Sequence, residues 1–67
     1  MFEKEVELNI VTIHNDQFNC NIDIEIDVDR DVVYWDVEEF FNQNKFITLS
    51  DGFRFNTKYI VTYKIMS

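Results

Sequence analysis

The sequence predicts a single α+β domain in which strands in the order ββαββ form an antiparallel sheet of about four strands packed on one helix. Stretches of alternating apolar and polar residues predict the strands, and a stretch with helical spacing predicts the helix. The chain has 67 residues, 46% of them hydrophobic, with no Pro and one Gly. This composition is too apolar for a disordered chain, so we treat residues 1–67 as one domain.

The clearest pattern is an alternation between residues 18 and 28. Its apolar members are Phe18, Cys20, Ile22, Ile24, Ile26 and Val28, separated by Asn19, Asn21, Asp23, Glu25 and Asp27. Residues 3–10 have the same parity, because Val6, Leu8 and Ile10 alternate with Glu3, Glu5, Glu7 and Asn9. Successive side chains of a strand point to opposite faces. We therefore expect a β-hairpin over residues 2–29 with an apolar inner face and an acidic outer face.

The parity also limits the register of this hairpin. If even-numbered residues of both strands face the core, the numbers of opposed residues must add to an even sum. A three-residue loop at residues 15–17 gives a sum of 32, which places Glu7 opposite Glu25 and Glu5 opposite Asp27. A strand of about eleven residues, at about 3.3 Å per residue, is roughly 36 Å long. Such a strand must extend beyond a compact domain or bend around it.

Residues 36–44 are expected to be helical. Asp36 with Glu39 three positions later has the capping-box pattern, and Val37, Phe40 and Phe41 share one side. Residues 32–35 are open to two interpretations, a helical extension, which we favour, or a short strand. In the helix, Trp35 lies on the polar side as an exposed aromatic anchor; in a strand, it covers the sheet.

The C-terminal third predicts a second hairpin. Residues 46–49 and 53–55 flank a turn of Ser50, Asp51 and Gly52, with Gly at a left-handed position. Alternation then continues to Ile65, with an expected kink near Asn56.

Charge and cysteine content restrict the class of function. Thirteen acidic and six basic residues give a formal net charge of −7, which repels nucleic acid and anionic membranes. No apolar run approaches the roughly 20 residues of a membrane span, and no signal-peptide layout is present. The single cysteine, Cys20, excludes an internal disulfide and is expected to fill the core in a reducing cytoplasm. A core this small is marginal alone, so a homodimer is expected.

Carboxylates are the candidate binding groups. Like charges opposed in a sheet are destabilising, and two rows of them give about one negative charge per 3.3 Å, roughly half the axial density of DNA. Either this face binds a basic partner or it is only solvated and partly neutralised by Arg54, Lys58 and Lys64. The candidate partner-binding residues are Glu3, Glu5, Glu7, Asp23, Glu25, Asp27, Asp29, Asp31, Trp35, Asp36, Glu38 and Glu39.

Other chemistries have weaker support. Asp27, Asp29, Asp31 and Glu38 match positions of a calcium-binding EF-hand loop, but Val32 replaces its obligatory Gly. His14, the only histidine, falls in a predicted turn, and no glycine-rich phosphate loop is present. We therefore assign no catalytic, cofactor-binding or metal-binding residue and expect the protein not to be an enzyme.

In length, acidity and strand-borne carboxylates at Glu3, Glu5, Glu7, Asp23, Glu25, Asp27 and Asp29, the chain resembles small bacteriophage proteins that mimic DNA. Among these are inhibitors of the bacterial histone-like protein HU. The resemblance implies a dimer whose carboxylates occupy the DNA-binding groove of HU in the host cytoplasm and displace DNA. The rival hypothesis is a structural or assembly protein that associates through its sheet edge, with its charge serving only solubility.

Overall fold

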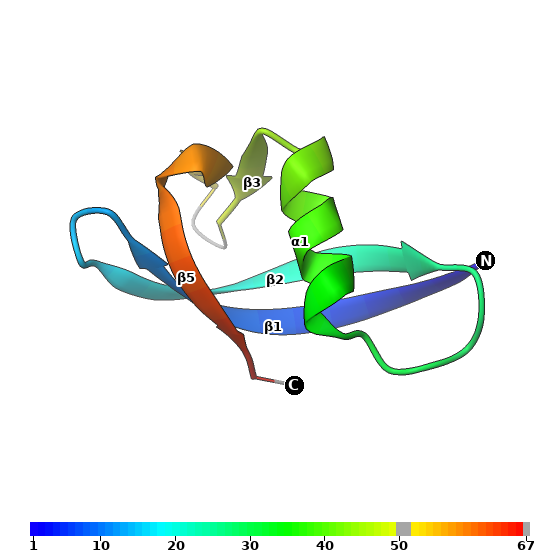
Figure 1. Cartoon of the computed structure of the whole chain (residues 1–67). Helices are drawn as coiled ribbons and strands as arrows, with labels where there is room; N and C mark the ends of the chain where they lie inside the picture. Colours follow the sequence, from blue (N-terminus) through cyan, green and yellow to red (C-terminus); the bar gives the residue numbers. More distant parts are fainter. Residues whose placement is uncertain (50–51, 67) are drawn as a thin grey trace.

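The computed structural model describes residues 1–49 and 52–66. Its elements are β1 (Phe2–Thr12), β2 (Gln17–Ile26), α1 (Tyr34–Gln43), β3 (Phe46–Thr48), β4 (Arg54–Asn56), the 3-10 turn η1 (Thr57–Tyr59) and β5 (Ile60–Ile65) (Figure 1). The α+β class with one helix and antiparallel strands is confirmed. The strands form two sheets, however, a three-stranded sheet in the order β2-β1-β5 and a two-stranded sheet of β3 and β4. The predicted ββαββ arrangement in one sheet is therefore not what is observed.

The hairpin of β1 and β2 has the predicted faces but a different register. Opposed residues add to 28, so that Glu3 faces Glu25 and Glu5 faces Asp23. The predicted sum of 32 is wrong because the turn comes earlier, at residues 13–15. Asn15 occupies the left-handed position with a φ of 63°, as a three-residue hairpin loop requires. Since each residue is opposed four positions away from its predicted partner, an even number, the parity and the core face are unaffected.

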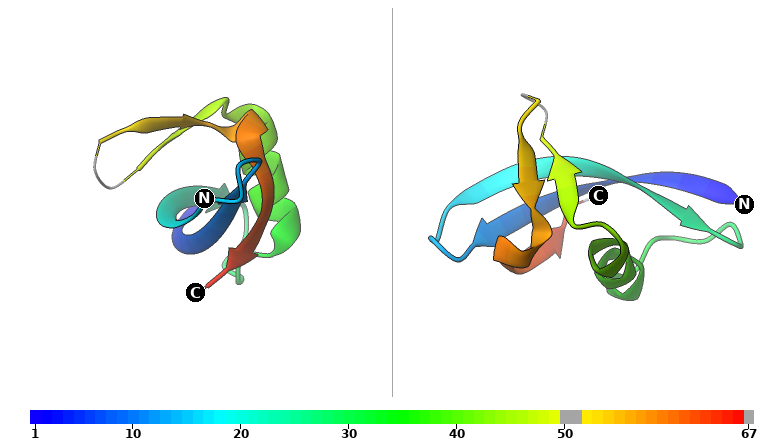
Figure 2. Two further views of the ribbon diagram at one scale, coloured as in Figure 1. Left: turned by 90° about the vertical axis from the view of Figure 1, so that its left-hand side faces the viewer. Right: turned by 90° about the horizontal axis from the view of Figure 1, so that it is seen from above.

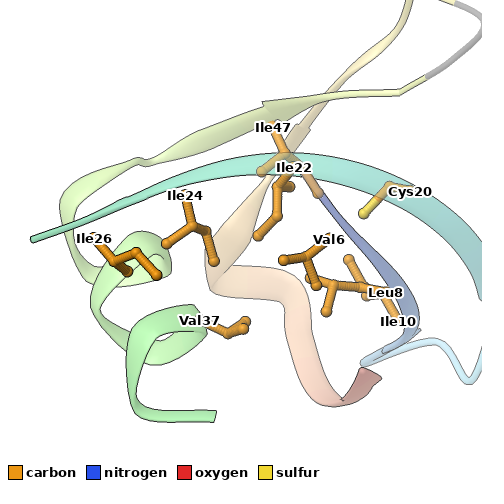
Figure 3. Packing of buried hydrophobic residues seen from close by; sticks show 9 residues of the cluster. All are labelled: Val6, Leu8, Ile10, Cys20, Ile22, Ile24, Ile26, Val37 and Ile47. Carbon is orange, nitrogen blue, oxygen red and sulfur yellow. The ribbon is translucent and has the colours of Figure 1, made fainter. Parts of the chain in front are cut away.

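The core lies on the inner face of this hairpin. Side chains of both strands point toward Val37 of α1 and Ile47 of β3 (Figure 3). The buried apolar residues of β1 and β2 are Val6, Leu8, Ile10, Cys20, Ile22, Ile24 and Ile26. Cys20 is the predicted core filler, and burial raises the pKa of its thiol. Val28, predicted to face inward, is exposed because β2 ends at Ile26.

The long hairpin determines the shape of the molecule, whose extents are 36 × 20 × 20 Å. Both strands bend along their length, and α1 and β5 cross them next to each other (Figures 1 and 2). Tyr63 of β5 joins these two elements, because its ring centroid lies 5.2 Å from that of Phe41 and 5.9 Å from that of Tyr34. The helix and β5 thus cover the inner face together.

The C-terminal run is divided where the sequence predicts a kink. The side chain of Asn56 accepts a hydrogen bond from the backbone N–H of Lys58 at 3.0 Å, which begins η1. Beyond this turn the chain leaves β3 and pairs with β1 as β5. In the preceding hairpin Gly52 has the predicted positive φ, 90°. Ser50 and Asp51 of that predicted turn lie outside the described residues.

The helix begins at Tyr34, so the favoured helical extension is confirmed for residues 34 and 35, whereas Val32 and Val33 precede the helix and Val33 is its N-cap. Asp36 is therefore the third helical residue and not the N-cap. Its carboxylate accepts the backbone N–H of Val33 at 2.9 Å and two hydrogen bonds from Arg30 at 2.8 and 2.9 Å. These bonds, Arg30 foremost, lower the pKa of the buried Asp36 to about 2. The loop before the helix is thus held to the first turn of α1.

Replacing Asp36 should reveal this contribution through pH. Because the folded state lowers the Asp36 pKa below the ordinary value of about 3.9, its carboxylate stabilises the fold above pH 4 and loses that effect as pH falls toward 2. Asp36→Asn should therefore lower the free energy of unfolding by about 1 to 3 kcal/mol at pH 7. The deficit should largely disappear at pH 2, as measured by urea unfolding. Asp31→Asn, an exposed change in the same loop, is the matched control, and an equal deficit at both pH values would contradict the assignment.

Candidate partner-binding surface

The outer face of the hairpin carries unpaired carboxylates at one end. We define the acidic face as Glu3, Glu5, Glu7, Asp23 and Glu25 of the two strands, together with Asp27, which directly follows the end of β2 at Ile26. Glu3 lies directly opposite Glu25, and Glu5 directly opposite Asp23. Side chains in such positions are about 4.5 to 5.5 Å apart at Cβ, and like charges there destabilise the pairing. At about 3.3 Å per residue, the acidic face extends along about 20 Å of strand.

Beyond Glu7 the opposed residues of the hairpin on this face are uncharged. Asn9 lies opposite Asn19 and donates a side-chain hydrogen bond to it at 2.9 Å. Here β5 lies alongside β1, and Lys64 is opposite Asn9. The third strand reaches only from Leu8 to Thr12 of β1, so the carboxylates occupy the part of the hairpin that β5 leaves uncovered. The negative charge is therefore concentrated at one end of the molecule.

The cations that could neutralise the acidic face are engaged elsewhere or lie at its border. Arg54 stacks over the ring of Phe46, with 4.7 Å between its guanidinium carbon and the ring centroid. Lys58 lies 5.1 Å from the centroid of Tyr59. Within the described part of the chain the ion pairs are Lys4 with Asp29 and Arg30 with Asp36, neither of which includes an acidic-face residue. Of the three cations expected to neutralise the acidic face, Arg54, Lys58 and Lys64, only Lys64 lies near it, opposite Asn9.

Trp35 lies beside this end of the hairpin. Its side chain is 73% exposed, as the helical interpretation of residues 34 and 35 predicts, and covering of the sheet by Trp35 is excluded. It lines an open groove of about 610 Å³ between the edge of β2 and α1, which we call the Trp35 groove. The carboxylates that line this groove belong to Glu3, Asp23, Glu25, Asp27, Asp36 and Glu39.

The remaining predicted site residues are separated from these. Asp29 was expected on the outer face, but the chain leaves the strand after Ile26 and Asp29 accepts a hydrogen bond from Lys4 at 2.6 Å. Asp31 is exposed in the loop before α1. Glu38 lies beside Tyr63, where burial, with a smaller contribution from Glu38, raises the pKa of the Tyr63 hydroxyl to about 12. The structure therefore divides the twelve candidates between the acidic face with its groove and positions away from it.

Arg30 is the groove residue that sequence reasoning missed. It lines the Trp35 groove and holds Asp36 through both carboxylate oxygens. In the sequence Arg30 lies in a short charged segment that indicates only a turn, and no periodic pattern links it to Asp36. Its role depends on the position of the helix start, which the sequence left open between residues 32 and 36 and which lies at Tyr34.

Two features are not found in residues 1–49 and 52–66: a cluster of metal ligands and a helix suited to cross a membrane. No group of three or more His, Cys, Asp or Glu side chains in that part is placed to hold a metal ion. Among the described residues, no helix combines the length and apolar character that a membrane-spanning segment requires. Comparison of the chain with models of protein families, with curated proteins and with solved structures finds no match.

Reversing one charge of an opposed pair should stabilise the protein. Glu25→Lys replaces a repulsion with Glu3 by an attraction, so the free energy of unfolding should rise by about 0.5 to 1 kcal/mol at low salt. Urea unfolding at low and high salt measures this gain, and screening should reduce it. Asn21→Lys, opposite Glu7, is the control, because it adds an attraction without removing a repulsion. A gain that survives Glu3→Gln but disappears with Glu7→Gln would contradict the observed register.

Proposed function

We propose that this protein is a non-enzymatic DNA mimic that binds the nucleic-acid-binding surface of a basic protein and displaces the nucleic acid. The observation that carries the proposal is the acidic face, where Glu3 opposes Glu25 and Glu5 opposes Asp23 with no ion pair to these residues in the described chain. Stability alone does not favour this arrangement. A row of carboxylates that forms no ion pair within the described part of the chain is suited to lysine and arginine side chains of a partner.

The position of the charge supports the same proposal. The acidic face lies at the end of the hairpin that β5 does not cover, so a partner reaches it without displacing any element. Its concentrated field attracts a basic protein over about one Debye length, roughly 8 to 10 Å near physiological salt. The resemblance to phage inhibitors names HU as the target to test first and the host cytoplasm as the site of action. Binding there would remove DNA from the target as part of host takeover.

We also propose that the protein acts as a homodimer. The acidic face is a poor contact between copies, because it would bring carboxylates of both chains together. Large apolar side chains are exposed elsewhere, with 71% of Phe53, 63% of Val61 and 44% of Phe46 accessible. A second copy that covers the β3–β4 hairpin would bury such surface and leave the acidic face open. The small core of a 67-residue chain makes that additional burial valuable.

Displacement of DNA from HU tests the proposed activity. The protein should release labelled DNA from HU in a gel-shift competition at low salt, because its carboxylates compete with phosphates for the same cations. Its affinity for HU, measured by isothermal titration, should fall by about tenfold or more between low and physiological salt. Failure to bind or displace at low salt would exclude HU as the target.

Charge-matched variants identify the surface used. Changing Glu5, Asp23 and Glu25 to their amides should weaken binding by about tenfold or more. Changing Asp16, Asp31 and Glu38 to their amides removes the same three charges away from the acidic face and should change affinity much less. Equal effects of the two triple variants would indicate that net charge alone acts. Unchanged binding by both would favour the alternative, an assembly protein whose acidic face serves only solubility.

The oligomeric state has a direct test. Light scattering with size-exclusion chromatography should give about twice the chain mass of 8.1 kDa at micromolar concentration. Phe53→Ser should shift the protein toward the monomer while leaving its circular dichroism unchanged, since this side chain is largely exposed. Glu25→Gln on the acidic face is the control and should leave the mass at that of the dimer. A monomer at all concentrations would contradict the proposal.

A further inference from the structure

Trp35 is an exposed aromatic side chain in a negatively charged groove. It is the only tryptophan of the chain, and 73% of its side chain is accessible. Glu39 lies one helical turn further along α1 and lines the same groove, as do Glu25 and Asp27. Large aromatic residues usually bury most of their surface, so an exposed indole beside carboxylates is a feature that core packing does not explain.

Among the described residues, no cation is found over the Trp35 indole. Arg30 is the basic residue among the described residues that line the groove, and its guanidinium donates to both carboxylate oxygens of Asp36. The cation–π contacts found in the described chain, Arg54 with Phe46 and Lys58 with Tyr59, lie on other elements. The face of the Trp35 ring is thus open to a cation from outside.

One wall of the groove is an unpaired strand edge. β2 is an outer strand of its sheet and pairs with β1 alone. The backbone N–H of the even-numbered Thr12 donates to the carbonyl of Asp16, on the β2 side of β1. The carbonyl of the odd-numbered Glu7 accepts a hydrogen bond from the N–H of Met66, on the β5 side. Backbone groups alternate in direction along a strand, so even-numbered residues of β1 and β2 bond to each other. Odd-numbered residues of β2 therefore direct their N–H and C=O groups to the open edge.

Asp23 and Glu25 are the odd-numbered β2 residues that line the groove. An extended segment could bond to their backbone groups as an added strand, as in β-augmentation. The carboxylates of the same residues lie on the acidic face and favour a basic segment over a neutral one. A second copy of β2 is disfavoured as occupant, because it would bring a further row of carboxylates beside the first.

We propose that the Trp35 groove binds an extended, arginine-containing segment of the basic partner, which adds as a strand to the open edge of β2. One arginine stacks its guanidinium on the Trp35 indole, and the carboxylates of Glu39 and Glu25 accept its hydrogen bonds. Arginine suits this site better than lysine, because its planar, weakly hydrated guanidinium both stacks on an aromatic ring and donates to carboxylates. This inference rests on the proposed function and specifies where and how the partner is recognised.

Two peptides of equal charge test the inference directly. One is a heptapeptide of alternating arginine and valine, and the other has lysine in place of arginine. The arginine peptide should bind about three- to tenfold more tightly by isothermal titration. Its binding should also shift the emission of Trp35 to shorter wavelength, since the indole becomes covered. Equal affinities without an emission shift would overturn the stacking of arginine on Trp35.

Variants on the two sides of α1 provide matched controls. Glu39→Gln, in the groove, should weaken the arginine peptide several-fold, whereas Glu38→Gln, beside Tyr63, removes the same charge and should not. Trp35→Ala should abolish the preference for arginine, whereas Phe53→Ala, a change at a similarly exposed aromatic, should preserve it. Two further arginine peptides test strand addition, one N-methylated at its odd-numbered backbone amides and the other at its even-numbered ones. Only one of the two sets of amides faces the edge of β2, so one peptide should lose binding and the other should keep it. Equal binding of the two peptides would overturn strand addition.

Failure of this inference can be separated from failure of the proposed function. If HU binds through the acidic face and Trp35→Ala leaves that affinity unchanged, the inference fails and the function stands. If the arginine peptide binds as described but neither HU nor its DNA complex responds to the protein, HU as the target fails and the groove assignment stands.

Discussion

The antiparallel pairing of β1 with β2 is the constraint on which the rest of the structure depends. It gathers the branched aliphatic residues of two strands on one face, and residues of α1, β3 and β5 pack against that face. The same period of two places every carboxylate of the acidic face on the opposite side. The core and the candidate binding surface are therefore the two faces of one hairpin. A change in the register of β1 against β2 would change both faces.

What the sequence could predict depends on how local each signal is. More than a dozen alternating residues show which side chains of β1 and β2 face the core. The two faces of the hairpin, the buried Cys20 and the exposed carboxylates were therefore all predicted. The register was not, because it depends on which polar residues form the turn, and residues 13–15 and 15–17 both satisfy the parity. Asn15 decides between them by adopting the left-handed conformation, to which Asn is well suited.

Helix and C-terminal boundaries depend on tertiary contacts that a single sequence does not display. The carboxylate of Asp36 caps from the third helical position because Arg30 reaches it from the preceding loop. The last alternating run reads as one strand, yet Asn56 and Lys58 turn the chain so that it joins a different sheet. The Trp35 groove could be predicted only in part. Trp35 and Glu39 share a helix face in the sequence, but their closeness to the edge of β2 depends on how α1 crosses the hairpin.

Charges in this protein fall into two groups with different physical roles. Asp29, Asp36 and Glu38 each have a partner within the fold, in Lys4, Arg30 and Tyr63 respectively. Among the described residues the acidic face forms no ion pair, and its charge interaction within the fold is that of Asp27 with Arg30. Lys64 lies only a few residues away on the same face, opposite the neutral Asn9. Exchanging Asn9 with either opposed glutamate would place a carboxylate beside Lys64 and relieve a repulsion, at no change in composition. The same residues in a different order would therefore give a locally more stable hairpin than the actual sequence does.

A face whose only requirement is solubility has no need of opposed carboxylates. A face that must present a dense row of negative charge to another protein does need them, because neutralisation within the fold would remove the field that attracts the partner.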